Sequence, residues 1–134
     1  MKGQNYPLPK ITISWGEYFD RLTILEIKLI KIVDETKQNH IKTSLLALNC
    51  EEKKLVESEI EIRKLVAELK VVNNELWEIE ESKRECERTK TFDEGFVELA
   101  RFVYKYNDKR AAIKKTIDIF LGSKLIEEKS YKPY

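Results

Sequence analysis

Residues 91–122, TFDEGFVELARFVYKYNDKRAAIKKTIDIFLG, are the stretch that decides the fold. Apolar residues recur along it at helical spacing, so the pattern predicts one long amphipathic helix. Thr91 and Glu94 have the spacing of an N-terminal capping box. Gly122 stands where many helices end in a left-handed residue. The stretch therefore predicts a helix together with its beginning and its end.

Three polar residues interrupt the apolar stripe of this helix. The stripe is formed by Phe96, Leu99, Ala100, Val103, Ile117 and Leu121. Asn107, Arg110 and Lys114 fall within it. Burying an unpaired charge costs roughly several kcal/mol of folding free energy. These three side chains are therefore candidates either for an internal network or for a binding site.

Length and composition predict a single all-α domain. The chain has 134 residues, 37% of them charged, with only 4 glycines and 3 prolines. Such a composition is typical of helices rather than of sheets or disordered chains. We expect one domain, 1–134, that holds an antiparallel bundle of three main helices. Its parts are an extended arm at 1–13, helices at 14–37, 43–90 and 91–122, and a tail at 123–134. The helix at 14–37 begins with a second capping box, Ser14 and Glu17.

The 43–90 segment predicts a long, coiled-coil-like helix. Its main apolar repeat of seven residues is Leu48, Leu55, Ile62, Leu69 and Leu76. Unbroken, it would span roughly 70 Å, whereas a compact domain of this length has a radius of gyration of roughly 14 Å. The helix either breaks around residues 49–54 or projects and pairs with a second copy.

A second apolar line on the long helix favours a homodimer. The line consists of Val56, Ile60, Ala67 and Val71. The alternative is that the arm at 1–13 or the helix at 43–50 folds over it.

The helical projection places further polar residues on the inner faces. Glu26 falls on the stripe of the first helix, and Glu80 and Asn73 on that of the second. In one interpretation these groups form a structural ion-pair network in which Glu26 and Glu80 bind Arg110 and Lys114.

In the other interpretation the same residues line a polar cleft. Arg110 and Lys114 would then bind an anionic small molecule, Arg110 by a bidentate fork. Asn107 and Asp108 would hydrogen-bond its hydroxyl groups, and Trp77 or Tyr104 would stack on a ring.

Charge and cysteine content exclude several classes of protein. The net charge is +1, with −6 in residues 51–100 (15 acids, 9 bases) and +5 in residues 101–134 (9 bases, 4 acids). We expect the basic segment to pack on the acidic one, with no nucleic-acid partner and no membrane span. Cys50 and Cys86 lack metal-binding spacing, so we expect no metal and no cofactor, and a cytoplasmic location. His40, the single histidine, is expected in a solvated loop.

Templates of known helical enzymes match weakly. Glu17 and Asp20, and likewise Glu78 and Glu81, have the i,i+3 spacing of the Mg²⁺-binding acids in all-helical nucleotide pyrophosphatases. However, such pairs are common in charged helices, and the projection turns Glu17 and Asp20 away from the core. A chorismate-mutase-like cleft needs several arginines, whereas the stripes supply only Arg110.

Four blocks of the chain resemble a small, all-helical family of unknown function found in bacteria and their phages. They are GEYFDRLTILEIK (16–28), NELWEIE (74–80), FD through NDKRAAIK (92–114) and EEKSY (127–131). The resemblance covers nearly the whole chain and implies no established activity. Some members of that family lie near, or are joined to, proteins of glycan metabolism. The family blocks contain Glu26, Glu80, Asn107, Arg110 and Lys114, which agrees with a cluster at these positions.

Two hypotheses of function follow. The first is a non-enzymatic helical interaction or scaffold protein that forms homodimers or binds a protein partner. The second is a binding or enzymatic domain for a sugar-like or phosphorylated metabolite, centred on Asn107, Asp108, Arg110 and Lys114. A sealed cluster would favour the first hypothesis, and an open cleft with unpaired donors the second.

Overall fold

The computed structural model describes residues 3–134, and every regular element in that range is a helix. The all-α class is therefore confirmed. Residues 1 and 2 of the expected arm lie outside the described range. The five helices are α1 (Trp15–Lys31), α2 (Glu35–Ala47), α3 (Glu52–Glu57), α4 (Ile60–Thr89) and α5 (Glu94–Phe120).

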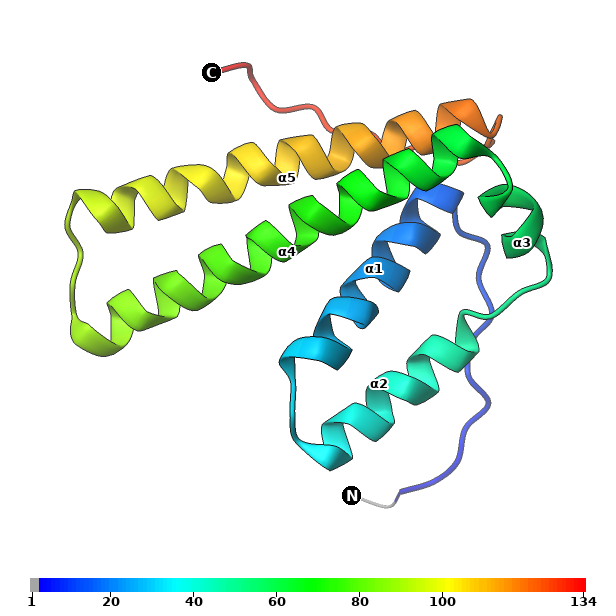
Figure 1. The fold of residues 1–134 in the computed structure, drawn as a ribbon, viewed down its shortest axis with the longest axis horizontal. Coiled ribbons are helices and arrows are strands. Elements are labelled where there is room, and N and C mark those ends of the chain that lie inside the picture. The colour runs from blue at the N-terminus through cyan, green and yellow to red at the C-terminus, as the bar shows by residue number, and fades with distance from the viewer. Residues whose placement is uncertain (1–2) are drawn as a thin grey trace.

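The frame of the molecule is an antiparallel hairpin of the two longest helices, α4 and α5 (Figure 1). Helix α1 packs against both of them near one end of the hairpin, α2 contacts α1, and α3 contacts α4. The far half of the hairpin extends beyond α1 and α2 (Figure 1). The core between the helices contains Phe19, Ile62, Leu69 and Ile117, each 0% exposed.

The first helix is shorter than expected. It ends at Lys31 rather than residue 37, and the expected break at 37–42 lies inside α2. The break comes earlier because Asp34 caps α2, accepting a hydrogen bond from the Lys37 amide (2.9 Å). The polar residues 37–40 are instead an exposed helix face, so His40 is exposed, but on a helix.

The segment expected as one helix at 43–90 is broken twice. One break lies between α2 and α3, at residues 48–51, which agrees with the expected break near residues 49–54. The second, at Ser58 and Glu59 between α3 and α4, was not predicted. Within the seven-residue repeat, Ile62 and Leu69 are in the core and Leu48 packs against it, whereas Leu55, which lies before this second break, is 74% exposed.

Both ends of α5 can be compared with the prediction. The capping residue is Asp93 rather than Thr91, and its Oδ1 accepts from the Phe96 amide (3.2 Å). The C-terminus is as predicted: Gly122 has φ +63°, the Gly122 amide donates to the Ile119 carbonyl and the Ser123 amide donates to the Asp118 carbonyl. This is the Schellman arrangement.

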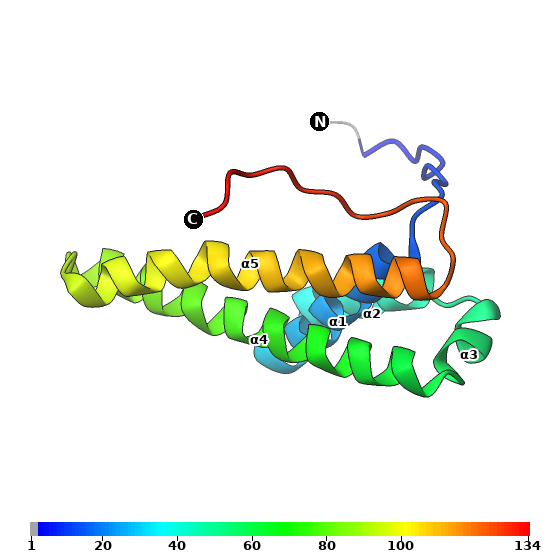
Figure 2. The same cartoon turned by 90° about the horizontal axis from the view of Figure 1, so that it is seen from above.

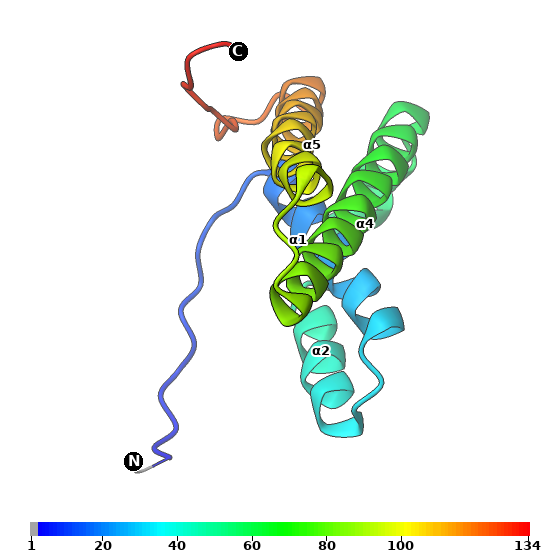
Figure 3. The same ribbon diagram turned by 90° about the vertical axis from the view of Figure 1, so that its left-hand side faces the viewer.

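Two extended segments flank the helices on one side. After Gly122 the tail turns back along α5 toward the hairpin turn (Figure 2). The arm is exposed over residues 3–12 and stands away from the helices (Figure 3), and Ile13 at its end packs against the core. Figure 2 places arm and tail on the same side of α5. No helix in the described range is both long and apolar enough to cross a bilayer.

Candidate functional site

A buried carboxylate on α1 is the centre of the polar cluster. The Asp20 side chain is 2% exposed. It accepts two hydrogen bonds from Arg110 of α5, from Nε at 2.8 Å and from Nη2 at 2.5 Å. Asn73 of α4 donates to the same carboxylate at 3.0 Å and to the Thr23 hydroxyl at 3.0 Å. Asp20 therefore joins the three helices of the core.

Lys114, one turn further along α5, binds three carboxylates. Its side chain is 8% exposed, and its Nζ lies 2.9 Å from Glu17, 3.2 Å from Glu127 and 3.7 Å from Asp20. Glu127 belongs to the tail, so this ammonium holds α1, α5 and the tail together.

A second buried acid, Asp118, binds backbone rather than a cation. It is 0% exposed. Its Oδ1 accepts from the Gly16 amide in the first turn of α1 (2.7 Å), and its Oδ2 from the Glu127 amide of the tail (3.0 Å). A carboxylate at a helix N-terminus is favourable because the unpaired amides and the helix dipole attract negative charge.

The pKa values within the cluster shift in the direction of stable ion pairs. Burial alone would raise the pKa of Asp20, but the hydrogen bonds from Arg110 and Asn73 and the nearby positive charges hold it below its ordinary value. The hydrogen bond from Lys114 is the main cause of the lowered pKa of Glu17. Burial opposes the charge of Lys114, yet its carboxylate partners raise its pKa, and the bonds to Asp20 raise that of Arg110. All four groups are therefore charged near neutral pH.

The buried polar atoms of the cluster all have partners. No buried side-chain nitrogen or oxygen in residues 3–134 lacks a hydrogen-bond partner. The same range contains no group of three or more His, Cys, Asp or Glu side chains arranged to hold a metal ion. The arrangement can fix α1, α5 and the tail in register, with its buried donors paired internally and the Arg110 side chain 30% exposed.

The acids of the cluster are not the expected ones. Glu26 pairs with Lys70 of α4 (3.4 Å) and is 41% exposed. Glu80 pairs with Arg84 (3.3 Å) on its own helix and is 50% exposed. The predicted pairing of Glu26 and Glu80 with Arg110 and Lys114 is therefore wrong.

The orientation of α1 explains why Asp20, and not Glu26, faces Arg110. Helix α1 packs into the angle between α4 and α5, which turns the line Gly16, Asp20, Thr23 and Ile27 inward. Our projection, centred on the larger apolar residues of α1, turned Asp20 outward. The three-and-four spacing of that line was the signal available in the sequence. Asp118 and Glu127 were also missed, because their roles depend on the return of the tail along α5.

Three further predicted site residues, Tyr104, Asn107 and Asp108, line an open groove between α5 and the tail. Asn107 accepts from Arg110 Nη1 at 3.4 Å, and Asp108 accepts from the Tyr134 hydroxyl at 2.9 Å. The rings of Tyr104 and Tyr134 meet edge to face with centroids 5.2 Å apart. Trp77, the other predicted stacking residue, is half-buried on α4 and does not line this groove. Ligand binding by any of these residues stays a prediction.

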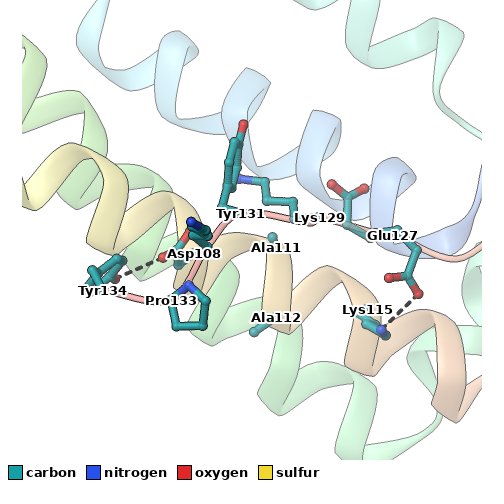
Figure 4. Close-up of a pocket in the computed structure, with 11 residues that line it drawn as sticks. Asp108, Ala111, Ala112, Lys115, Glu127, Lys129, Tyr131, Pro133 and Tyr134 are labelled. Atoms are coloured by element: carbon teal, nitrogen blue, oxygen red, sulfur yellow. Dashed lines mark hydrogen bonds and ion pairs between the residues drawn. The ribbon is translucent and has the colours of Figure 1, made fainter.

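The tail divides the groove into two hollows. One, of about 290 Å³, has Ala111 and Ala112 of α5 among its lining residues (Figure 4). The other, of about 360 Å³, is lined by Val103, Tyr104, Asn107, Asp108, Lys129, Tyr131 and Tyr134. Asp108, Lys129, Tyr131 and Tyr134 line both hollows. Of the predicted residues, the structure thus places Arg110 and Lys114 in the ionic cluster, and Tyr104, Asn107 and Asp108 at an open groove.

Comparison with known proteins identifies a family but no activity. Neither the curated proteins nor the solved structures contain a match to this chain. A family model described as a family of unknown function, DUF6165, matches residues 9–134. That range includes α1 to α5, the cluster and the groove. The chain therefore belongs to the DUF6165 family of unknown function.

Proposed function

We propose that this protein is a non-enzymatic helical interaction module that works as a homodimer, and that its ionic cluster is structural. The pairing inside the cluster supports the second part, because every buried polar atom there already has a partner and none of them is left over to hold a substrate. Cys50 and Cys86 are free thiols, which supports a location in the reducing cytoplasm.

The observation that carries the proposal is the exposed arm. Tyr6, Leu8 and Ile11 are 75%, 87% and 68% exposed, and the arm stands away from its own helices (Figure 3). Large apolar side chains gathered on one exposed segment are typical of an association surface.

A second copy is the partner that we propose for the arm, because the chain itself offers an apolar place to receive it. A hollow between α1 and the α2–α3 region is lined mainly by apolar residues, among them Leu22, Leu45, Leu46 and Leu48. Leu46 is 75% exposed there. If two copies exchanged arms, each arm would be buried in the hollow of the other copy. Such a reciprocal contact is the self-complementary arrangement of a two-fold dimer.

The test is the mass of the full chain in solution, measured by light scattering after gel filtration. We expect about twice 15.9 kDa. The triple variant Tyr6→Ser, Leu8→Ser, Ile11→Ser should dissociate at least roughly tenfold more readily, because burial of apolar area drives such contacts. The matched control is Gln4→Ser, Lys10→Ser, Thr12→Ser, which changes polar arm residues and should leave the dimer intact.

Two results would contradict this proposal. One is a monomer at a protein concentration of roughly 100 µM, where even a weak specific dimer forms. The other is a dimer that tolerates the triple apolar variant, which would show that another surface holds the two copies.

The open groove favours a second candidate function, the binding of a sugar-like or phosphorylated metabolite. Its support is that Tyr104, Asn107 and Asp108, three of the residues predicted for such a ligand, line one hollow together with tail residues. Arg110 and Lys114 are left out of this candidate, since their bonds to Asp20 and Glu17 already engage them.

A further inference from the structure

The groove between α5 and the tail has the size and form of a small-molecule site. Its hollows measure about 290 and 360 Å³, near the lower end of the range of roughly 300–1,000 Å³ for ligand pockets. Ala111 and Ala112 leave room between helix and tail because their side chains are single methyl groups. Figure 4 shows them beneath the tail, between Asp108 and Lys115.

Tyrosine rings provide flat faces along the groove. Tyr104, Tyr131 and Tyr134 line the larger hollow and are 44%, 78% and 79% exposed. Tyr104 and Tyr134 meet at an interplanar angle of 65°, edge to face, which leaves a ring face open on each side of the contact. Open tyrosine faces of this kind stack on planar rings.

Two of the lysines at the groove have no carboxylate partner in the described part of the chain. Lys115 pairs with Glu128 (2.9 Å), and Glu127 pairs with Lys114 (3.2 Å). Lys129 and Lys132 also line the groove, and neither forms an ion pair within residues 3–134. Two ammonium groups without a carboxylate partner are suited to a phosphate.

Hydroxyl-binding groups lie between the rings and the lysines. Asp108 lines both hollows, and its carboxylate accepts one hydrogen bond, from the Tyr134 hydroxyl. Asn107 lines the larger hollow, with its side-chain oxygen 3.4 Å from Arg110 Nη1, which leaves the amide nitrogen free to donate. A carboxylate acceptor beside an amide donor can bind the two hydroxyl groups of a ribose.

We propose that this groove binds a nucleoside monophosphate. The base would stack on the tyrosine faces, the ribose hydroxyls would bond to Asp108 and Asn107, and the phosphate would lie at Lys129 and Lys132. This inference rests on the second candidate function and gives its ligand a chemical class. It does not depend on dimer formation, because all the residues involved belong to one chain.

The test is calorimetric titration of the full-length protein with four probes: AMP, adenosine, inorganic phosphate and ribose 5-phosphate. We expect AMP to bind at least roughly tenfold more tightly than each of the other three, because only AMP joins a stacking ring to the anion. Lys129→Gln with Lys132→Gln should weaken AMP at least roughly tenfold and leave adenosine unchanged.

A steric variant tests the location. Ala112→Leu fills the smaller hollow without altering any polar group, and should abolish AMP binding. The matched control is Ala47→Leu, the same exchange at another exposed helical alanine, on α2. It should bind AMP like the natural chain. Equal circular dichroism spectra of the two variants would show that both are folded.

Each failure has its own meaning. No heat with AMP at millimolar concentration overturns the proposed site. Equal binding of ribose 5-phosphate and AMP overturns the proposed stacking of the base. The ligand of the groove would then be a phosphorylated metabolite of the broader class. AMP binding that survives Ala112→Leu places the ligand elsewhere. Light scattering on the same samples decides the homodimer separately, so the two proposals fail independently.

Discussion

Gly16 is a residue at which α1 closely approaches α5. A Cβ atom built there would lie 2.4 Å from the Lys114 carbonyl oxygen and 2.7 Å from Asp118 Oδ1. The first of these is backbone and cannot rotate away. Because the Gly16 amide donates to Asp118, any retreat of α1 would also break the bond that caps its N-terminus.

Gly16→Ala should therefore destabilise the protein by about 3 kcal/mol, at the upper end of the range for overpacked sites. Urea unfolding followed by circular dichroism measures it. Gly95→Ala is the matched control, since a Cβ there meets only the Asp93 side chain, at 3.1 Å. That variant should stay within about 0.5 kcal/mol of the natural chain, or gain stability from the better helix former. Equal losses at the two positions would show that the close approach of α1 to α5 does not matter.

Single residues also show where prediction of the site succeeded and where it failed. Arg110 and Lys114 could be identified because they interrupt an apolar stripe, and that signal is independent of the neighbouring helices. Their partners could not be identified, because the choice between Asp20 and Glu26 depends on how far α1 rotates about its own axis. The two residues are six positions apart, which places them roughly 120° apart around the helix, so the rotation of α1 decides which of them faces α5.

At the level of elements, the sequence predicted helices more reliably than their ends. Gly122 was identified because a left-handed residue at a helix end is a local requirement. The break at Ser58 and Glu59 was not, since neither Gly nor Pro marks it. Polar residues 37–40 suggested a break although they continue α2, because an exposed helix face and a loop have the same composition.

The turn between α4 and α5 contains a residue under strain. Lys90 has φ +54°, the one non-glycine residue of the described range with a positive φ. The conformation closes α4, since it lets the Thr91 amide donate to the Cys86 carbonyl at 2.9 Å. A side chain in the left-handed region costs roughly 1 kcal/mol compared with glycine.

Lys90→Gly should accordingly stabilise the protein by about 0.5–1 kcal/mol, because the ion pair that it removes, with Glu87, is well exposed and contributes little. Thermal unfolding measures the gain as a higher melting temperature. Lys124→Gly is the control, a lysine of the exposed tail without a positive φ, and should give no gain. Equal behaviour of the two variants would mean that the hairpin turn relaxes without cost.

Considered as a whole, the molecule is a hairpin to which α1 is attached by apolar packing and by charge, and the tail by charge. Lys114 and Asp118 each contact both α1 and the tail, and Arg110 attaches α1 to the middle of α5. Apolar contacts alone do not specify the position of the tail, because its own apolar residues Leu125 and Ile126 are 46% and 44% exposed. The cluster therefore determines the arrangement of these parts, and the stability of the whole fold should depend on its protonation.

The directions of the pKa shifts predict how the stability of the fold changes with pH. Asp20 and Glu17 have lowered pKa values in the folded chain. Their contribution is complete above the unfolded values of about 4, and it is lost as the pH falls through the folded values. Lys114 has a raised pKa, so its contribution is complete below an unfolded value of about 10.4 and is lost only as the pH rises through the folded value. We expect a plateau of stability between about pH 5 and 9.

Asp20→Asn tests this through the acid side of the plateau. At pH 7 the variant should lose about 2–3 kcal/mol, somewhat less than a fully buried pair, because the Arg110 side chain is 30% exposed. Below pH 4 the natural chain loses the same contribution by protonation, so the two unfolding free energies, measured in urea at pH 7, 5, 4 and 3, should converge. Glu80→Gln, which removes an acid that is 50% exposed, should change the free energy by less than about 0.5 kcal/mol at pH 7. A constant difference between the natural chain and Asp20→Asn from pH 7 to pH 3 would mean that folding does not shift the pKa of Asp20, and that other acids weaken the fold in acid.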